Sequence, residues 1–102
     1  VTFNLATSQN IEHALTENTT VSFSGAAAGM SGGLVFTNDG TGRTVTMPAN
    51  GTGIEYDAAI LALTVTGIVD ATANTRTVLA YYVMSAVANR IYVYARSTST
   101  IP

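Results

Sequence analysis

The chain has 102 residues, enough for one domain but too few for two halves that each bury a core of their own. It contains no cysteine, which excludes disulfides and thiolate metal sites, and its 4 scattered arginines cannot form the basic stripe that nucleic-acid binding needs. Only 10% of the residues are charged and the net charge is −2, so we expect partners, most simply further copies of the chain, to cover part of its surface.

The first half of the chain is predicted to form short strands between turns. The opening residues, VTFNLATSQN, lack a basic region followed by an apolar stretch, so we expect no signal peptide in this chain. In TVSF, Val21 and Phe23 share one face of the predicted strand, and in RTVTM, Val45 and Met47 do the same. Turn-forming residues separate such segments at 8–10, 16–18, 24–33, 38–42 and 48–53.

The stretch NDGTGRTVTMP, residues 38–48, is predicted to be a tight hairpin. Asparagine and aspartate favour turns, glycines supply positive φ, and Pro48 ends the strand that follows because it has no N–H to donate. We expect Asp39 and Arg43 to pair across the turn, with a contribution of no more than about 1 kcal/mol. The structural turn residues are Asn38, Asp39, Gly40, Gly42 and Arg43.

In the second half, the segment YDAAILALTVTGIVDA allows either a helix or a strand. Asp57 can cap a helix, but Thr64 to Gly67 weaken it, so the pattern favours a strand at LALTVT with one helical turn near Asp57 to Ile60. The 12 uncharged residues between Asp57 and Asp70 are too few for a membrane-spanning helix, which needs about 20.

The C-terminal segments TRTVLAYYVMSA and RIYVYAR are predicted to form a hairpin, closed by a loop around Ser85 to Asn89 with a break near Ala88 and Asn89. The first segment is apolar on both faces, which is typical of a central or interface-covered strand. Together the segments predict an all-β fold: residues 1–102 form one domain, an antiparallel β-sandwich (jelly-roll-like) or a β-barrel of about eight short strands.

Few side chains in the sequence suggest chemistry. His13 is the only histidine, and a hydrolytic triad also needs a nucleophile and an orienting acid, so a packing role is favoured. The oxygen ligands of Asn38, Asp39, Glu55 and Asp57 are too few for calcium, and no calcium loop is present. The glycine-rich GAAAGMSGG lacks the phosphate-binding pattern. We therefore predict a protein that is not an enzyme and has no metal or cofactor.

The tyrosines are the better candidates for binding. In the last strand, Tyr92 and Tyr94 are predicted to project from one face together with Arg90 and Arg96, and these residue types are enriched at interface hot spots. A cross-strand aromatic ladder on a solvated sheet is the alternative, and both interpretations stay open. The candidate contact residues are Tyr81, Tyr82, Arg90, Tyr92, Tyr94 and Arg96.

One stretch resembles a known family. LVFTNDGTGRTVTMPAN, residues 34–50, is similar to a pattern in a small β-rich module of bacteriophage virion proteins, which include tail-fibre and other surface proteins. The preceding NIEHALTENTTVSFSG looks like the two short strands of that module, and TVLAYYVMSAVANRIYVYARS looks like its closing hairpin. The resemblance implies a non-enzymatic structural protein at the surface of a phage particle, made in the host cytoplasm.

Three functions follow as expectations. The first is a capsid decoration (cement) protein that forms homotrimers, as such phage proteins commonly do, and binds neighbouring capsid subunits. The second is a receptor-binding or structural module of a tail fibre or spike, in which Tyr81, Tyr82, Tyr92 and Tyr94 stack on host glycans. The third and weaker one is a free carbohydrate-binding β-sandwich. None of them involves nucleic acid or a membrane.

Overall fold

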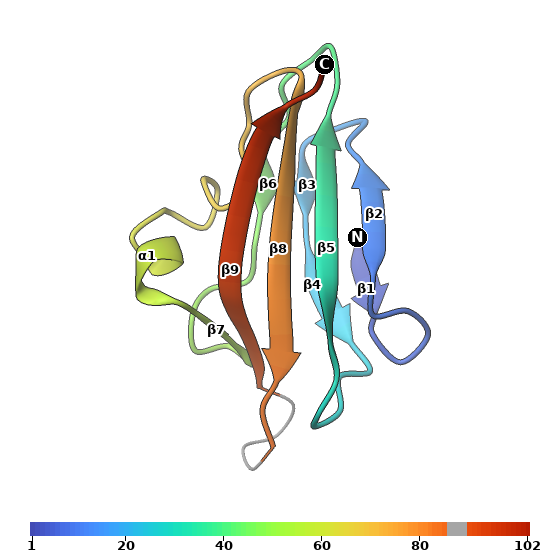
Figure 1. The fold of residues 1–102 in the computed structure, drawn as a ribbon, viewed down its shortest axis with the longest axis vertical. Coiled ribbons are helices and arrows are strands. Elements are labelled where there is room, and N and C mark those ends of the chain that lie inside the picture. Colours follow the sequence, from blue (N-terminus) through green and yellow to red (C-terminus); the bar gives the residue numbers. More distant parts are fainter. Residues whose placement is uncertain (86–89) are drawn as a thin grey trace.

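The computed structural model of the chain describes residues 1–85 and 90–102 and consists mostly of strands (Figure 1). One short helix, α1 (Ala58–Leu61), follows β7. The all-β prediction is confirmed, whereas the predicted loop and break between Ser85 and Asn89 lie, from residue 86 on, outside the described residues. Within those residues the strands are β1 (Thr2–Asn4), β2 (Ile11–Ala14), β3 (Thr19–Thr20), β4 (Ser22–Ser24), β5 (Ser31–Asn38), β6 (Val45–Thr46), β7 (Ile54–Tyr56), β8 (Thr75–Val83) and β9 (Ile91–Thr100).

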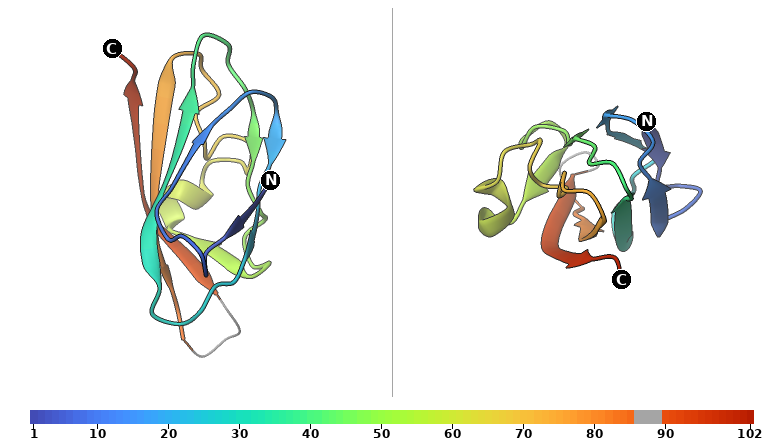
Figure 2. Two further views of the ribbon diagram at one scale, coloured as in Figure 1. Left: turned by 90° about the vertical axis from the view of Figure 1, so that its right-hand side faces the viewer. Right: turned by 90° about the horizontal axis from the view of Figure 1, so that it is seen from above.

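Five strands form a mixed sheet in the order β2-β5-β8-β9-β7, in which only β8 runs against its neighbours. The short strands opposite this sheet pair in parallel, β1 with β4 and β3 with β6 (Figure 2, left). The antiparallel, jelly-roll-like expectation is therefore wrong in its strand directions, although β8 and β9 do form the predicted antiparallel pair. From β1 to β7 the chain repeatedly crosses from one layer to the other. After two crossings it is back in the same layer and runs in the same direction, so the next strand pairs in parallel with an earlier one.

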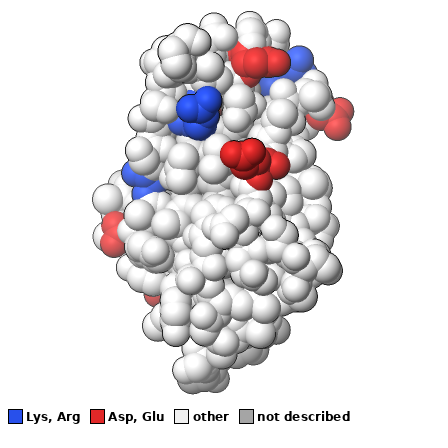
Figure 3. All heavy atoms as spheres, turned by 45° about the vertical axis from the view of Figure 1, so that its right-hand side comes forward, with Lys and Arg blue, Asp and Glu red and all other residues white. Residues whose placement is uncertain are grey.

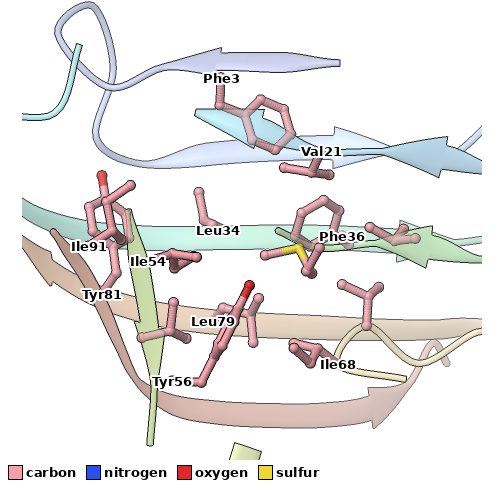
Figure 4. Packing of buried hydrophobic residues seen from close by; sticks show 14 of the residues in the cluster. Phe3, Val21, Leu34, Phe36, Ile54, Tyr56, Ile68, Leu79, Tyr81 and Ile91 are labelled. Atoms are coloured by element: carbon pink, nitrogen blue, oxygen red, sulfur yellow. The ribbon is translucent and has the colours of Figure 1, made fainter. Parts of the chain in front are cut away.

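The hydrophobic core lies between the two layers. In Figure 4, Leu34 and Phe36 of β5 and Leu79 of β8 face Phe3 of β1 and Val21, which lies between β3 and β4 in the opposite layer. All five are at most 6% exposed, as expected where every second side chain of a strand points to the same face. The second layer and its connections add Leu5, Leu15, Val45 and Met47 to this core.

The segment 61–66, predicted to be a strand, forms none: residue 61 ends α1 and residues 62–66 are irregular. The predicted helical turn is confirmed: α1 begins after Asp57, whose carboxylate accepts a hydrogen bond of 3.2 Å from the backbone of the first turn. Within this turn Ile60 reaches the core, while Leu61 and Leu63 are 48% and 36% exposed. Leu61 follows the buried Ile60 in the helix and so points to another side, and Leu63 lies beyond the end of the helix, so the two leucines do not form the buried row that a strand would give.

Residues 38–48 connect the two layers and do not form the predicted hairpin. β5 pairs with β2 and β8, whereas β6 pairs with β3 in the opposite layer, because the apolar side of β6 is needed to close the core. Positive φ at Gly40 and Gly42 was also expected and is not found at either. Gly42 is needed for another reason: a Cβ atom there would lie 2.3 Å from the carbonyl oxygen of Ala71.

The side chain of Asn38 holds this connection from inside. Asn38 is 1% exposed; its Nδ2 donates to the carbonyl oxygens of Arg43 (3.0 Å) and Asp70 (2.7 Å), and its Oδ1 accepts from the Arg43 amide (2.8 Å). The predicted ion pair between Asp39 and Arg43 is wrong for the described residues, because the Arg43 guanidinium donates to the carbonyl oxygen of Thr16 instead. The turn is thus fixed by a buried amide and not by an exposed charge pair.

Candidate functional site

The outer face of the five-stranded sheet, opposite the short strands, has no covering layer (Figure 2, left). Cross-strand neighbours share a face, so the pairing of β5, β8 and β9 fixes which side chains project outward. The middle of this face carries small or apolar residues, namely Gly33, Val35, Val78, Ala80 and Ala95. Figure 3 shows charged side chains in the upper half of its view and along one edge, and a wide area without them below.

Three tyrosines continue this face toward the start of β9, and we call them the tyrosine patch. Tyr82 of β8 lies opposite Tyr92 of β9, and the ring centroids of Tyr92 and Tyr94 are 6.4 Å apart. Tyr82 and Tyr94 are 43% and 49% exposed. Beside them Arg90 and Glu55 form an ion pair of 2.8 Å, whose half-exposed side chains limit its contribution to about 1 kcal/mol at most. This arrangement is consistent with an interface hot spot and with a cross-strand aromatic ladder, because the Tyr82–Tyr92 pair joins two strands and also lies on an accessible surface.

Tyr81, a predicted contact residue, is buried instead. It is 0% exposed, and its hydroxyl donates to the carbonyl oxygen of Gln9 at 2.8 Å. Burial raises the pKa of the Tyr81 hydroxyl, so it remains a neutral donor. Consecutive residues of a strand point to opposite faces, and since Leu79 and Val83 face the core, Tyr81 does so too and Tyr82 faces out.

Arg96 also leaves the predicted group, because β9 contains a β-bulge. Ala80 pairs with Ala95 but Tyr81 pairs with Val93, so Tyr94 is an extra residue that shifts the alternation of β9 by one. Arg96 consequently lies opposite buried Leu79, and its Nε donates to the carbonyl oxygen of Ile68 at 2.6 Å. Period-2 reasoning alone places Arg96 on the same side as the tyrosines, and no turn residue in YVYAR signals the bulge.

Sequence reasoning missed Val78 as a residue of this face. Val78 is 37% exposed and lies between Val35 and Ser97 in the register of the sheet. The signal was present, because an apolar residue at an outward position is what makes the segment TRTVLAYYV apolar on both faces. The outer face is thus broader than the tyrosines alone.

The side chains considered for chemistry have structural contacts. The ring of His13 lies edge-on to Phe3 and Phe36, with centroids 5.6 Å and 6.4 Å away. Of the oxygen ligands considered for calcium, Glu55 pairs with Arg90 and Asp57 caps α1, as described above. Among residues 1–85 and 90–102, no three histidine or acidic side chains come together as a metal site would require.

A hollow of about 340 Å³ lies beside β4, lined by residues that include Phe23, Pro48, Ile54 and Ile91. Its lining contains no acidic, basic or histidine side chain in the part of the chain that the structure describes. General acid–base or nucleophilic catalysis requires such groups within hydrogen-bond reach of a substrate. Among the described residues, this hollow therefore offers apolar contacts and serine and threonine hydroxyls, without an acid or base beside them.

Comparisons with known proteins give no relative: no family model matches the sequence, and no curated protein or solved structure is similar to it. The one helix in the described residues is four residues long, far shorter than a membrane-crossing helix.

Proposed function

We propose that this chain is a non-enzymatic structural protein of a bacteriophage particle, a capsid decoration (cement) protein that forms homotrimers on the shell. The observation that carries the proposal is the outer face of the sheet, with its charge-free middle and its exposed Tyr82, Tyr94 and Val78. The link to a phage rests on the resemblance of residues 34–50 to the virion module.

The composition of the outer face suits a protein partner. Interfaces have a core depleted in charge and a polar rim, and tyrosine is enriched in them because it buries a large area and keeps a hydroxyl for hydrogen bonding. Here the middle of the face is apolar, while the Arg90–Glu55 pair lies at its lower margin, Glu12 lies beside Val35 on the edge strand β2, and Arg76 lies toward its upper end. The same layout supports contact with a capsid subunit or with a second copy.

A decoration protein stabilises a shell by binding only the assembled form. The gain in shell stability follows from mass action: a protein that binds only the assembled shell lowers the free energy of the assembled state and not that of the free subunits. A stiff domain serves this role well because little conformational entropy is lost on binding. The buried polar bonds of Asn38 and Tyr81 supply such stiffness on the inner side of the sheet.

The test compares particles assembled with and without this chain. We expect particles that carry it to release their genome at a higher temperature. The double variant Tyr82→Ser/Tyr94→Ser should bind the shell weakly and lose this protection, while Glu17→Gln, an exposed change away from the face, should keep it. Equal heat resistance of particles with and without the chain would contradict the proposal.

A receptor-binding or structural module of a tail fibre or spike is the second candidate. The neighbouring rings of half-buried Tyr92 and exposed Tyr94 favour it, because flat aromatic surfaces can bind glycans. Copy number separates the candidates: hundreds of copies per particle indicate decoration, and a few dozen or fewer indicate a tail component. Glycan binding without any association with a particle would favour the third candidate, a free carbohydrate-binding protein.

A further inference from the structure

A second surface feature lies at the edge of the sheet, where β9 leaves its neighbour β7. A hollow of about 440 Å³ lies between α1 and β9. Leu63 and Ala59 line it from the helix side, and Tyr94 and Arg96 line it from β9, with Asp57 at the helix start. A hollow of this size holds one or two sugar-sized rings.

The β-bulge determines which side chain of β9 reaches this hollow. Without the extra residue, β9 would keep a strict alternation along its length; with it, Tyr94 stands between the two registers and is 49% exposed. Bulges often occur next to functional sites, where they redirect a side chain. An exposed aromatic ring beside a hollow is therefore built into the backbone of the sheet.

The polar groups at the two ends of the hollow are held in place by the fold. The Asp57 amide donates to the carbonyl oxygen of Val93 at 2.9 Å, directly beside the bulge, and Ile60 anchors the helix in the core. At the other end, Arg96 is fixed by its bond from Nε to the carbonyl oxygen of Ile68. Groups positioned in advance lose little entropy when a ligand binds.

Both polar side chains keep hydrogen-bonding capacity that the fold does not use. Asp57 accepts through Oδ2, and no described residue donates to its Oδ1. Arg96 donates through Nε and weakly through one terminal nitrogen, and no described residue accepts from Nη1. The two side chains form no ion pair with each other. Asp57 and Arg96, which line the hollow together with Tyr94, thus keep a free acceptor and a free donor.

We propose that this hollow binds a neutral pyranose sugar, with one face of the sugar ring on Tyr94 and its hydroxyls on Asp57 and Arg96. Tyrosine offers an apolar ring face for the C–H groups of a pyranose, and hydroxyls can both donate to the carboxylate and accept from the guanidinium. One negative and one positive group give no net charge preference, which favours a neutral ligand. This binding activity goes beyond the decoration role proposed above, gives the glycan-binding candidates a specific site, and needs no virus particle.

The experiment uses the isolated full chain and a panel of neutral monosaccharides: glucose, galactose, mannose and N-acetylglucosamine. Each is titrated while amide shifts are followed by NMR. We expect at least one sugar to shift amides near Asp57 to Leu63 and Tyr94 to Arg96, with a Kd of about 1 mM, as suits a shallow site. Tyr94→Ser should weaken this binding about tenfold or more, equivalent to about 1.4 kcal/mol.

Two further variants make the result specific. Tyr82→Ser removes a tyrosine of similar exposure that does not line the hollow, and we expect it to leave binding unchanged. Asp57→Asn keeps a good helix cap but loses the charge, so it should reduce affinity while the fold stays intact. The proposal is overturned if none of the four sugars shifts these amides, or if Tyr82→Ser abolishes binding as Tyr94→Ser does.

Discussion

The two faces of the five-stranded sheet use the same kinds of residue in opposite ways. On the inner face the buried polar side chains have partners: Tyr81 donates to Gln9, Asn38 makes three hydrogen bonds, and the Thr77 hydroxyl accepts from an amide at 3.0 Å. On the outer face Tyr82 and Tyr94 are open to solvent. The inner face specifies the fold, and the outer face is free to specify a partner.

The adjacent tyrosines of β8 give the sharpest test of this comparison. Tyr81→Ala removes a fully buried aromatic side chain and leaves a cavity, so we expect a loss of about 3–5 kcal/mol in the free energy of unfolding. Tyr82→Ala removes a half-exposed ring and should cost less than about 1 kcal/mol. Urea denaturation of both variants measures the difference. Similar losses at the two positions would show that the outer face also supports the fold of the isolated chain.

Much of this inner and outer division could be predicted from the sequence. Alternation put Val45 and Met47 on one face, and both are buried; the patterns also predicted the antiparallel pairing of β8 with β9. Applied to Tyr81 and Tyr82 it would also have separated them, because adjacent strand residues cannot share a face. Local patterns succeed where one buried face dictates which residues are apolar.

The remaining features depend on contacts between distant segments. The bulge at Tyr94 is visible only in the register against β8, and it moves Arg96 to the inner side. The parallel pairing of the short strands depends on layer crossings that leave no local signature. Gly42 looked like a turn residue, but its role is set by the backbone near Ala71, about thirty residues later in the chain.

Asn38 tests whether a single buried amide holds the connection between the layers. Asn38→Ala would leave two carbonyl oxygens and one amide without their partner, and at about 1 kcal/mol for each hydrogen bond we expect a loss of about 2–3 kcal/mol. Asp39→Ala, next to it but exposed, is the matched control and should change stability by less than about 0.5 kcal/mol. Equal stability of the two variants would show that Asn38 is not one of the buried polar side chains that hold the inner face together.

Two glycines of residues 38–48 allow the same comparison between an enclosed and an open position, here for the backbone. Gly42→Ala places a Cβ 2.3 Å from a carbonyl oxygen, so the chain must shift, and we expect a cost of about 1–3 kcal/mol. At Gly40 nothing lies within 4 Å of the added Cβ, and φ is not positive, so Gly40→Ala should be neutral or slightly stabilising. Thermal unfolding of the two variants gives the comparison, and a larger loss at Gly40 would contradict it.

Asp70 bonds to the inner network through its backbone and to a neighbouring loop amide through its carboxylate. Replacing its side chain gives the smallest expected change in stability. Its backbone bonds inward to Asn38 and Thr77, while its carboxylate accepts from the Thr72 amide at 2.9 Å. The backbone and side-chain hydrogen bonds from Thr72, with a lesser influence of Arg96, lower the pKa of Asp70 below its ordinary value of 3.8. A lowered pKa means that the folded state favours the carboxylate, so this stabilisation is present above pH 3.8 and is lost as the pH falls through the folded-state pKa.

Asp70→Asn should therefore make the loss of stability below pH 4 slightly shallower, while at pH 7 the variant should be only a little less stable because the backbone bonds remain. Urea midpoints measured from pH 7 to pH 3 test both statements. A large loss at pH 7 would mean that the carboxylate, and not the backbone of Asp70, supports the inner network. An unchanged acid profile would instead place the acid-sensitive group elsewhere in the chain.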